Sequence, residues 1–400
     1  MRRVTIVGGG FSGLTAAYYL ARGGADVTLV EKQSRLGGMV DTVATPQGLV
    51  ETAASGIRNS GRLESLCREL GVPLVHTMKE SKRRYLFRNG KPTQWPLGLG
   101  ESFGFAGKLG AHLLTGSFRP KAGESVDAWG ARVIGVTPTR KILNAVLQGV
   151  YAGDPASLSA SLLFGKREKP PKPARAGLVA PPNGLAQLTA TIVDKLHELG
   201  VEIRTGANGD GVFDGITVLA TSARDCSALL KDRALETSKA LASIDMVPLL
   251  RVTAFYASAE NSWPGFGTLF PRDEGVRALG VLFNTNIFPN RGDGHSESWI
   301  YGGAQDRAIL DLDDAALFEI MDRDRERLVG KRVEPIARYP QRWHVGLPHY
   351  DLHLEKLSPA KLPLPENVFL TGNYLRGIGL PMLLEQSHAT AMSILARNGK

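Results

Sequence analysis

The sequence has little cysteine and no long apolar run. Cys67 and Cys226 are too few for a disulfide framework, and no Cys-x-x-Cys pair indicates a zinc or redox site. The longest uncharged run, residues 176–193, is broken by Pro-Pro-Asn-Gly and does not predict a membrane-spanning helix. Four apolar residues after Met-Arg-Arg are too short for the core of a signal peptide. We therefore expect a cytoplasmic protein whose membrane contact is at most peripheral, on the inner face of the cell membrane.

The composition excludes further classes of protein. A chain of 400 residues that is 43% hydrophobic and 22% charged is neither disordered nor fibrous, and it has room for two or three domains. Its 48 Lys and Arg against 39 Asp and Glu give a net charge of +9, which favours an anionic partner: nucleic acid, acidic lipid or a polycarboxylate ligand. The basic residues are scattered and accompany no nucleic-acid-binding motif, so we expect no nucleic-acid partner.

The first forty residues carry the strongest pattern. Residues 4–7 predict a short buried strand, residues 14–21 a helix and residues 27–30 a second strand, with G-x-G-x-x-G at Gly8, Gly10 and Gly13. This order is typical of the start of a dinucleotide-binding domain. Gly8 permits the tight turn, Gly10 lets the backbone approach a pyrophosphate, and Gly13 lets the helix pack on the strand. Phe11 and Ser12 lie between these glycines and are assigned to the cofactor site, and the N-terminus of the helix offers free N–H groups to phosphate.

The residues after the second strand indicate which nucleotide binds. Glu31 ends that strand and can accept hydrogen bonds from a ribose diol. Glu31, Lys32, Arg35, Gly37 and Gly38 lie in the pattern E-x-x-x-R-x-G-G, which resembles FAD enzymes of the amine-oxidase-like superfamily. The resemblance implies FAD as cofactor, with Arg35 near the pyrophosphate and the two glycines beside the flavin.

The C-terminus supplies the second half of the predicted cofactor site. Residues 367–373 predict a buried strand that opens into a glycine turn, and a last helix begins near Pro381. A glycine-flanked helix start presents N–H groups to negative charge, such as the N1–C2=O side of a reduced flavin. The residues that we assign to the cofactor here are Gly372, Asn373, Gly377, Gly379 and Leu380.

The middle of the chain predicts two insertions. Residues 96–165 are mostly helical by pattern, and the apolar spacing at 185–199 predicts an amphipathic helix that ends at Gly200. Residues 248–345 alternate strand-like runs with glycine turns and hold one helix at 315–328, which is entered through Asp313-Asp314. We predict an α/β protein with a Rossmann-like FAD-binding domain (1–80, 178–246 and 350–400). A helical, membrane-associating subdomain (81–177) and an α+β substrate domain (247–349) are inserted into it. Asn89-Gly90 predicts a hairpin turn within the helical subdomain.

Several segments together resemble one family. Glu124-Ser125-Val126, followed by G-V-Y-A-G-D-P at 149–155, is similar to the protoporphyrinogen oxidases, which include the coproporphyrinogen oxidases that produce coproporphyrin. The segments 56–58, 265–271, 288–291, 301–303 and 348–350 also resemble that family, in order along nearly the whole chain. The resemblance implies six-electron oxidation of a porphyrinogen to a porphyrin, with O2 as acceptor and hydrogen peroxide released, in heme biosynthesis.

The resemblance also implies a substrate site. Phe266 and Leu269 match positions that hold the tetrapyrrole ring, Ile300 is a third candidate wall, and Arg58 matches an arginine that contacts a propionate in some members. Plain core packing explains each wall residue taken alone equally well, and a surface ion pair explains Arg58 equally well. We expect no catalytic acid–base pair, because the flavin accepts the hydride.

The sequence departs from the family between the strands at 201–203 and 215–221. The family has a three-stranded meander there that contacts adenine, and eleven residues, 204–214, cannot form it. This leaves two alternatives open: a flavin- or porphyrin-binding homologue with impaired catalysis, or another flavoenzyme of the amine-oxidase superfamily, such as an amine oxidase or desaturase.

Three further expectations depend on weaker patterns. Residues 95–118 are a candidate membrane-facing patch, with a buried helical layer as the plainer alternative. His344, His349 and His353 do not predict a metal site, because Gly346 and Pro348 break any helix that would align them. The sequence does not decide between proto- and coproporphyrinogen or fix the oligomeric state, for which a homodimer is one option.

Overall fold

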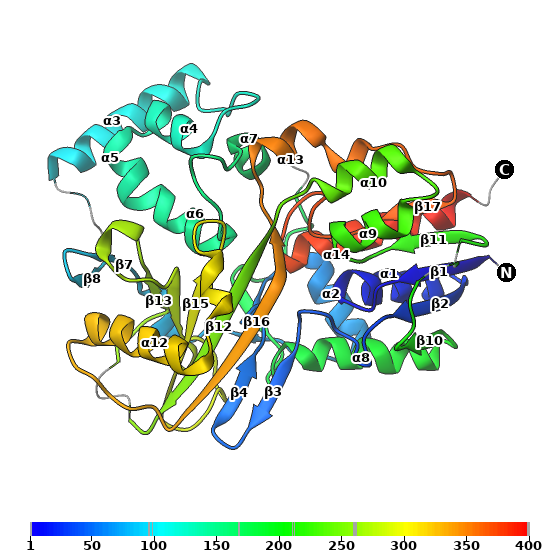
Figure 1. Ribbon diagram of the computed structural model, residues 1–400, viewed down its shortest axis with the longest axis horizontal. Helices are drawn as coiled ribbons and strands as arrows, with labels where there is room; N and C mark the ends of the chain where they lie inside the picture. The colour runs from blue at the N-terminus through cyan, green and yellow to red at the C-terminus, as the bar shows by residue number, and fades with distance from the viewer. Residues whose placement is uncertain are drawn as a thin grey trace.

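A five-stranded parallel sheet forms the first half of the molecule. The computed structural model describes residues 2–94, 97, 99–166, 169–209, 211, 213–258 and 262–397. The strand order is β10 (Glu202–Thr205), β2 (Asp26–Glu31), β1 (Arg3–Val7), β11 (Ile216–Leu219) and β17 (Val368–Leu370), so strands from both ends of the chain share one sheet (Figure 1). This confirms the predicted α/β class and the predicted return of the later strands to the first sheet.

Helices cover both faces of this sheet. One core joins β1 and β2 to α1 (Phe11–Arg22), α2 (Gly61–Leu70), α8 (Leu185–Glu198) and α14 (Leu380–Ala396). A second core contains α9 (Ala223–Leu230), α10 (Leu235–Ala242), α13 (Leu352–Leu357) and parts of the helical segment. The first and last long helices, α1 and α14, pack together, and the Ser387 hydroxyl donates to the Ser12 carbonyl at 2.9 Å.

A seven-stranded mixed sheet forms the other half. Its order is β16 (Ala337–Pro348), β12 (Met246–Tyr256), β15 (His295–Gly302), β14 (Gly280–Phe283), β13 (Gly267–Leu269), β7 (Arg84–Arg88) and β8 (Lys91–Thr93). The predicted hairpin at Asn89-Gly90 is present, since both residues have positive φ (52° and 74°). Its placement in a helical subdomain of residues 81–177 is wrong, because β7 pairs in parallel with β13 and extends the mixed sheet.

The mixed sheet has one face packed against a helix. Helix α12 (Asp314–Val329) lies along this face (Figure 1). Its apolar residues share one core with Phe270, Val281, Trp299 and Tyr301. The predicted entry of this helix is confirmed, because the Asp313 carboxylate accepts the Ala316 N–H at 2.8 Å. Since side chains alternate along a strand, the intervening residues point to the opposite face.

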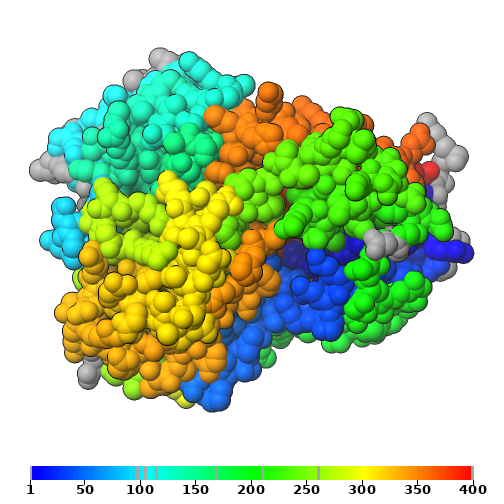
Figure 2. Space-filling model, in the orientation of Figure 1, coloured from blue at the N-terminus to red at the C-terminus, as the bar shows by residue number. Residues whose placement is uncertain are grey.

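The remaining helices form a lobe beside the mixed sheet. They are α3 (Leu99–Thr115), α4 (Val126–Val133), α5 (Val136–Pro138), α6 (Asn144–Tyr151) and α7 (Ala160–Phe164), with α11 (Asn284–Ile287) on the mixed sheet itself. Figure 2 shows this lobe in cyan and teal above the yellow and orange sheet. Among the described residues, no helix is both long and apolar enough to cross a bilayer. Trp95, Pro96 and Gly98 of the candidate membrane patch lie outside the described residues.

Two small sheets connect the halves. The hairpin of β3 (Thr42–Thr45) and β4 (Gly48–Glu51) extends toward the mixed sheet, where a Cβ on Gly48 would lie 2.5 Å from the Gly292 Cα. The second sheet has the order β5 (Ile57–Arg58), β9 (Leu178–Ala180) and β6 (Val75–His76). The segment after β4 therefore runs from the mixed sheet back to the parallel sheet, along the boundary between them.

The segment after β10 differs from the family pattern as expected. No strand lies between β10 and β11 among the residues described there, which omit Asp210 and Val212. The Gly206 N–H donates to the Gln33 carbonyl at 3.0 Å, and the Ala207 N–H donates to the Glu31 carbonyl at 3.1 Å. A short loop therefore crosses the carboxyl end of β2, where a three-stranded meander was expected in the family.

Candidate functional site

The glycine turn after β1 has the geometry that its spacing predicts. Gly8 has φ +108°, and a Cβ on Gly13 would lie 1.8 Å from the Gly8 carbonyl oxygen, so both positions require glycine. A Cβ on Gly10 would meet only the Gly38 Cα, at 3.9 Å, so the space above Gly10 is open. Helix α1 begins there with no side-chain cap. These features fit a pyrophosphate held by helix N–H groups.

The acid and the cations after β2 make local contacts. The Glu31 carboxylate accepts the N–H groups of Gly9 (2.6 Å) and Gln33 (2.8 Å), which places it at the glycine turn. Lys32 forms an ion pair with Asp225 of α9 at 2.9 Å. Arg35 donates to the Gly38 carbonyl at 2.7 Å and so braces the second glycine turn. The predicted ribose and pyrophosphate contacts of Glu31 and Arg35 stay predictions.

The two glycine turns and the C-terminal helix lie on one side of the parallel sheet. Gly37 has φ +101°, and its N–H donates to the Gly9 carbonyl at 2.8 Å. Helix α14 begins at Gly379 without a side-chain cap; Ser387 contacts Ser12 and Leu395 lies beside Gly23, so α14 runs parallel to α1 and its N-terminus lies about two helical turns before the level of Ser12. Two uncapped, glycine-initiated helices therefore offer N–H groups to an anionic dinucleotide. Gly372, Asn373, Gly377 and Leu380 lie between β17 and the first turn of α14, as expected.

The open face of the mixed sheet is turned toward this cofactor region. Arg251 on β12 donates to the Ala53 carbonyl at 2.6 Å, and the Trp343 indole on β16 donates to the Thr52 carbonyl at 2.9 Å. Phe266 also packs against the core of the parallel-sheet half. The segment 52–55 thus holds the open face of one sheet against the cofactor half of the molecule.

Two predicted wall residues lie in one row across this face. Leu269, Gly280, Ile300, Arg251 and Gln341 are paired in register across β13, β14, β15, β12 and β16. Paired residues point to the same face, so the half-buried side chains of Leu269 and Ile300 lie on the open face on either side of Gly280. The Leu269 side chain lies over Gly280 and against Gly149 of α6, and Ile300 packs against the cluster that contains Ala152, so the row is apolar and borders the helical lobe.

The other two predicted substrate residues lie elsewhere. Phe266 precedes β13 and lies under the guanidinium of Arg84, 4.3 Å from the ring centroid. Arg58 is exposed on β5, in the small sheet rather than the mixed sheet, and forms no ion pair with the other residues that the structure describes. The structure therefore groups Leu269 and Ile300 but does not bring Arg58 into their row.

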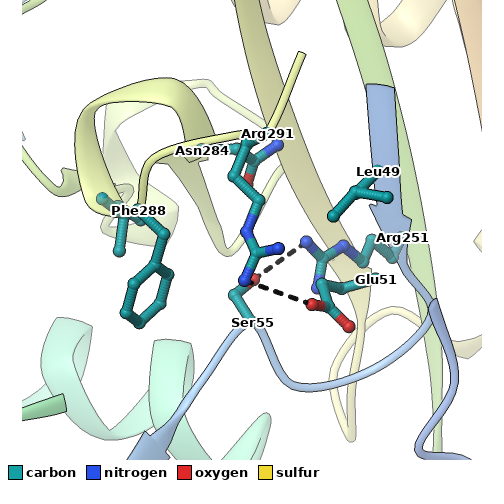
Figure 3. A pocket seen from close by; sticks show the side chains of 8 residues that line it. Leu49, Glu51, Ser55, Arg251, Asn284, Phe288 and Arg291 are labelled. Carbon is teal, nitrogen blue, oxygen red and sulfur yellow. Dashed lines mark hydrogen bonds and ion pairs between the residues drawn. The ribbon is translucent and has the colours of Figure 1, made fainter. Parts of the chain in front are cut away.

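Beside the row lies a buried charged cluster that the sequence did not reveal. We call Glu51, Arg251 and Arg291 the arginine cluster; these side chains are 3%, 5% and 3% exposed. Arg251 donates to the hydroxyl groups of Ser55 (2.9 Å) and Ser298 (2.7 Å), and Arg291 lies 3.6 Å from the Glu51 carboxylate (Figure 3). The sequence feature that could have revealed this cluster is Arg251, a charged residue within the apolar run of β12.

Burial perturbs all three groups of the arginine cluster. It lowers the pKa of Arg251 to about 10 and lowers the pKa of Arg291, because a buried guanidinium loses its water shell. Burial raises the pKa of Glu51, although the Thr42 hydroxyl and both arginines favour its ionised form. The Glu51 carboxylate also accepts the Leu185 N–H at 3.2 Å, at the start of α8.

The most family-specific motif has a structural role. Within G-V-Y-A-G-D-P, the Asp154 N–H donates to His349 Nε2 at 3.2 Å, and the Ala152 carbonyl accepts the Ala304 N–H at 2.8 Å. The motif therefore joins the helical lobe to the mixed-sheet half. His353 contacts the Ser243 hydroxyl instead, so these two histidines have separate partners.

Comparison with known proteins identifies the family of this chain. Residues 11–392 match the family described as flavin containing amine oxidoreductase. A chloroplastic protoporphyrinogen oxidase of Oryza sativa subsp. japonica is 27% identical over 97% of this chain and 87% of its own length. Coproporphyrinogen III oxidase of Bacillus subtilis (strain 168) is 22% identical, over 98% of both chains.

A solved structure agrees with the fold. A protein from Exiguobacterium sp. 255-15, provisionally named protoporphyrinogen oxidase, superposes with a TM-score of 0.80 over 99% of both chains at 19% identity. At that identity the likeness shows the fold alone. The family match covers most of the chain, and the glycine turns and uncapped helix N-termini fit a dinucleotide cofactor. This chain therefore belongs to the flavin containing amine oxidoreductases and uses a flavin cofactor.

Proposed function

We propose that this protein uses FAD to oxidise a porphyrinogen to the porphyrin, with O2 as acceptor, in heme biosynthesis. The observation that carries the proposal is the apolar row of Leu269, Gly280 and Ile300 on the sheet face turned toward the cofactor half. A tetrapyrrole is broad and apolar, so it needs such a wall. Relatives named for protoporphyrinogen and coproporphyrinogen III oxidation support this substrate class, and we favour protoporphyrinogen IX.

The proposed reaction balances over three rounds. Each round removes two electrons and two protons from the macrocycle and reduces one O2 to one H2O2, so one porphyrinogen yields one porphyrin and three H2O2. FAD, when bound, supplies the two-electron acceptor of each round. No acidic or basic side chain has to move a proton in the Leu269–Ile300 part of the row, where the protein orients the macrocycle and excludes water.

Each half of the proposed site has its own task. The N-termini of α1 and α14 bind negative charge on the cofactor, whereas the open sheet face positions the ring. The segment 52–55 links the two halves through its carbonyl contacts to Arg251 and Trp343. We expect this link to fix the spacing between flavin and substrate.

The decisive experiment combines cofactor analysis with turnover. The purified protein is saturated with FAD, its bound flavin is identified after denaturation, and it is incubated in air with protoporphyrinogen IX or coproporphyrinogen III. We expect bound FAD, growth of porphyrin fluorescence above the autoxidation rate, and three H2O2 per porphyrin. A protein that binds FAD and oxidises only amines or polyenes would refute the substrate assignment.

A second function is favoured by one observation, the short loop 206–209 in place of the family's meander. A protein with a weakened adenine contact could hold flavin or porphyrin without oxidising it. A preparation that retains added porphyrin but no flavin after saturation with FAD would support this function and exclude the oxidase.

A further inference from the structure

A second cavity lies on the parallel-sheet half of the molecule. It is an open groove of about 710 Å³ between α1, α2, α14 and the segment 171–172, and we call it the outer groove. Its α1 residues are at the C-terminal end of that helix, and Arg22 lies roughly 16 Å along α1 from Phe11 at the glycine turn. The volume is in the range of small-molecule sites. No residue of the glycine turns or of the apolar row lines this groove, so it is separate from the proposed cofactor and substrate sites.

Part of the outer groove is apolar and aromatic. His388, Met392 and Leu395 recur at helical spacing on one face of α14, and the His388 ring meets the Tyr19 ring edge to face, with the centroids 4.8 Å apart. Burial and the charge of Arg62 lower the pKa of His388, so its ring is neutral near pH 7 and belongs to the apolar surface. Met392 is 38% exposed. Two rings and a thioether sulfur favour contact with another aromatic ring.

Ion pairs hold the three helices of the outer groove together. Arg22 of α1 forms an ion pair with Glu69 of α2, and Arg62 of α2 pairs with Glu385 of α14 at 2.6 Å. Both pairs join α2 to a neighbouring helix. The groove is therefore part of the folded framework, and a ligand can enter it without moving a helix.

The end of the outer groove at Lys172 is also held in place. The Gly61 N–H donates to the Pro171 carbonyl at 2.7 Å, and the Glu64 carboxylate accepts the Ala174 N–H at 2.9 Å. The bond from Ala174 holds the pKa of Glu64 below its usual value, so this carboxylate stays ionised and engaged with the segment. The backbone that carries Lys172 is thus fixed to α2, beside the groove.

Two cations of the outer groove have no carboxylate partner. Arg68 and Lys172 are exposed and form no ion pair with any other residue in the described ranges. Among the described residues, four cations border the groove with three carboxylates, so one positive charge is in excess: Arg22, Arg62, Arg68 and Lys172 against Glu64, Glu69 and Glu385. A ligand with a single negative charge would neutralise this excess, and the planar fork of a guanidinium matches a carboxylate.

We propose that the outer groove is a binding site for one aromatic monocarboxylate. The rings of the ligand lie on Tyr19, His388 and Met392, and its carboxylate pairs with Arg68 and Lys172. Gly61, which contacts the Lys172 segment, is seven residues before Arg68 on α2, or about 10 Å, a separation that two long side chains can bridge. This site does not depend on the proposed oxidation of a porphyrinogen, because it shares no residue with the apolar row.

The first test compares probes that differ in one property. Binding of 2-naphthoate is measured by isothermal titration calorimetry in saturating FAD, beside neutral 2-naphthamide, saturated decahydro-2-naphthoate, and acetate. We expect one naphthoate site per chain and at least about fivefold weaker binding of the other three, which lack the charge, the ring faces or the apolar body. Equal binding of naphthamide would overturn the anionic assignment, and equal binding of decahydronaphthoate would overturn the aromatic one.

Arg68→Met tests the charge of the outer groove. Arg68 is exposed on α2, so the variant should fold normally and bind naphthoate about fivefold more weakly, with naphthamide unchanged. The matched control Arg224→Met removes an exposed arginine of α9 in the same half of the molecule, outside the groove, and should bind naphthoate fully. An equal loss in both variants would show a general effect of net charge and refute the site.

Two further variants locate the bound probe. Met392→Glu places a carboxylate on the apolar part of the groove; because Met392 is already exposed, the melting temperature should change little and naphthoate binding should be lost. Ile300→Glu alters the apolar row instead and should leave naphthoate binding unchanged. Full binding by Met392→Glu, or loss of binding in Ile300→Glu alone, would place the probe elsewhere and overturn the site. None of these measurements requires turnover, so their outcome is independent of the porphyrinogen assay.

Discussion

Glu297 gives the sharpest stability prediction. Its carboxylate is 0% exposed on the α12 side of β15 and accepts hydrogen bonds from His295 Nε2, Trp299 Nε1 and Arg325 Nε, each at 3.0 Å. Arg325 is 2% exposed on α12, so carboxylate and guanidinium are removed from water together. This network joins the mixed sheet to its covering helix.

Glu297→Gln keeps the shape and removes the charge. The amide leaves the buried guanidinium of Arg325 without a counter-charge, and breaking one side of such a pair costs about 3–5 kcal/mol. We therefore expect the free energy of unfolding to fall by that amount, measured by chemical denaturation with tryptophan fluorescence. The control Glu319→Gln removes an exposed carboxylate on α12, the helix of Arg325. Glu319 pairs with Arg332 at the surface, so this variant should change the free energy of unfolding little.

The double variant Glu297→Gln/Arg325→Met tests the cause. Replacing both partners removes the uncompensated charge, so most of the lost stability should return. A loss below about 1 kcal/mol in the single variant, or a double variant less stable than the single one, would refute the reasoning.

Acid should remove the stability that the ionised Glu297 carboxylate contributes. Burial opposes ionisation of Glu297, but the hydrogen bond from His295 and the charge of Arg325 outweigh it, so its pKa lies below the ordinary value. A depressed pKa stabilises the folded state above the unfolded pKa, about 4.3, and this contribution disappears as pH falls through the folded pKa. The stability gap between the natural protein and Glu297→Gln should therefore be constant near neutral pH and narrow below about pH 4.

Three further outcomes are expected. Gly10→Val should fill the open space at the glycine turn and lower the flavin content of the purified protein, measured by absorbance, at least about tenfold. The control Gly104→Ala adds a methyl group with no other atom within 4 Å and should leave the flavin content unchanged. Ile300→Glu should raise KM for the porphyrinogen more than it lowers kcat, because it places a charge in the apolar row. Burial raises the pKa of Cys67 to about 12, so its thiol should resist a disulfide reagent at pH 8 until the protein unfolds.

Features encoded in neighbouring residues could be predicted from the sequence. The turn at Gly8, the hairpin at Asn89-Gly90 and the Asp313 cap each depend on residues a few positions apart, and the structure confirms them. Amphipathic spacing likewise predicted α8, which ends before Gly200 at φ +75°. Local conformational preference and periodicity decide such elements whatever the rest of the chain does.

Features that depend on distant pairing could not be predicted. β7 joins β13 in parallel although their residues, such as Tyr85 and Thr268, are far apart in sequence, so the hairpin was assigned to the wrong part of the molecule. The arginine cluster likewise assembles from β4, β12 and the turn after α11. No spacing rule relates those segments, and only the folded sheet brings their charges together.

The short loop after β10 decides which measurement separates the two candidate functions. The loop crosses the carboxyl ends of the parallel strands, and it lies so close to β1 that a Cβ on Gly209 would lie 2.4 Å from Val7 Cγ1. Parallel sheets of this kind bind nucleotides at this edge. The loop's two backbone hydrogen bonds, to the carbonyl groups of Glu31 and Gln33 at the end of β2 and just beyond it, hold it in place without a meander. The glycine turns and helix starts that would hold the pyrophosphate and the flavin are intact, so any loss of affinity concerns the adenosine end alone. A weakened adenosine end lowers occupancy without altering the sheet face that would hold the ring. Turnover measured at saturating FAD therefore tests the substrate face, whereas the FAD dissociation constant tests the loop.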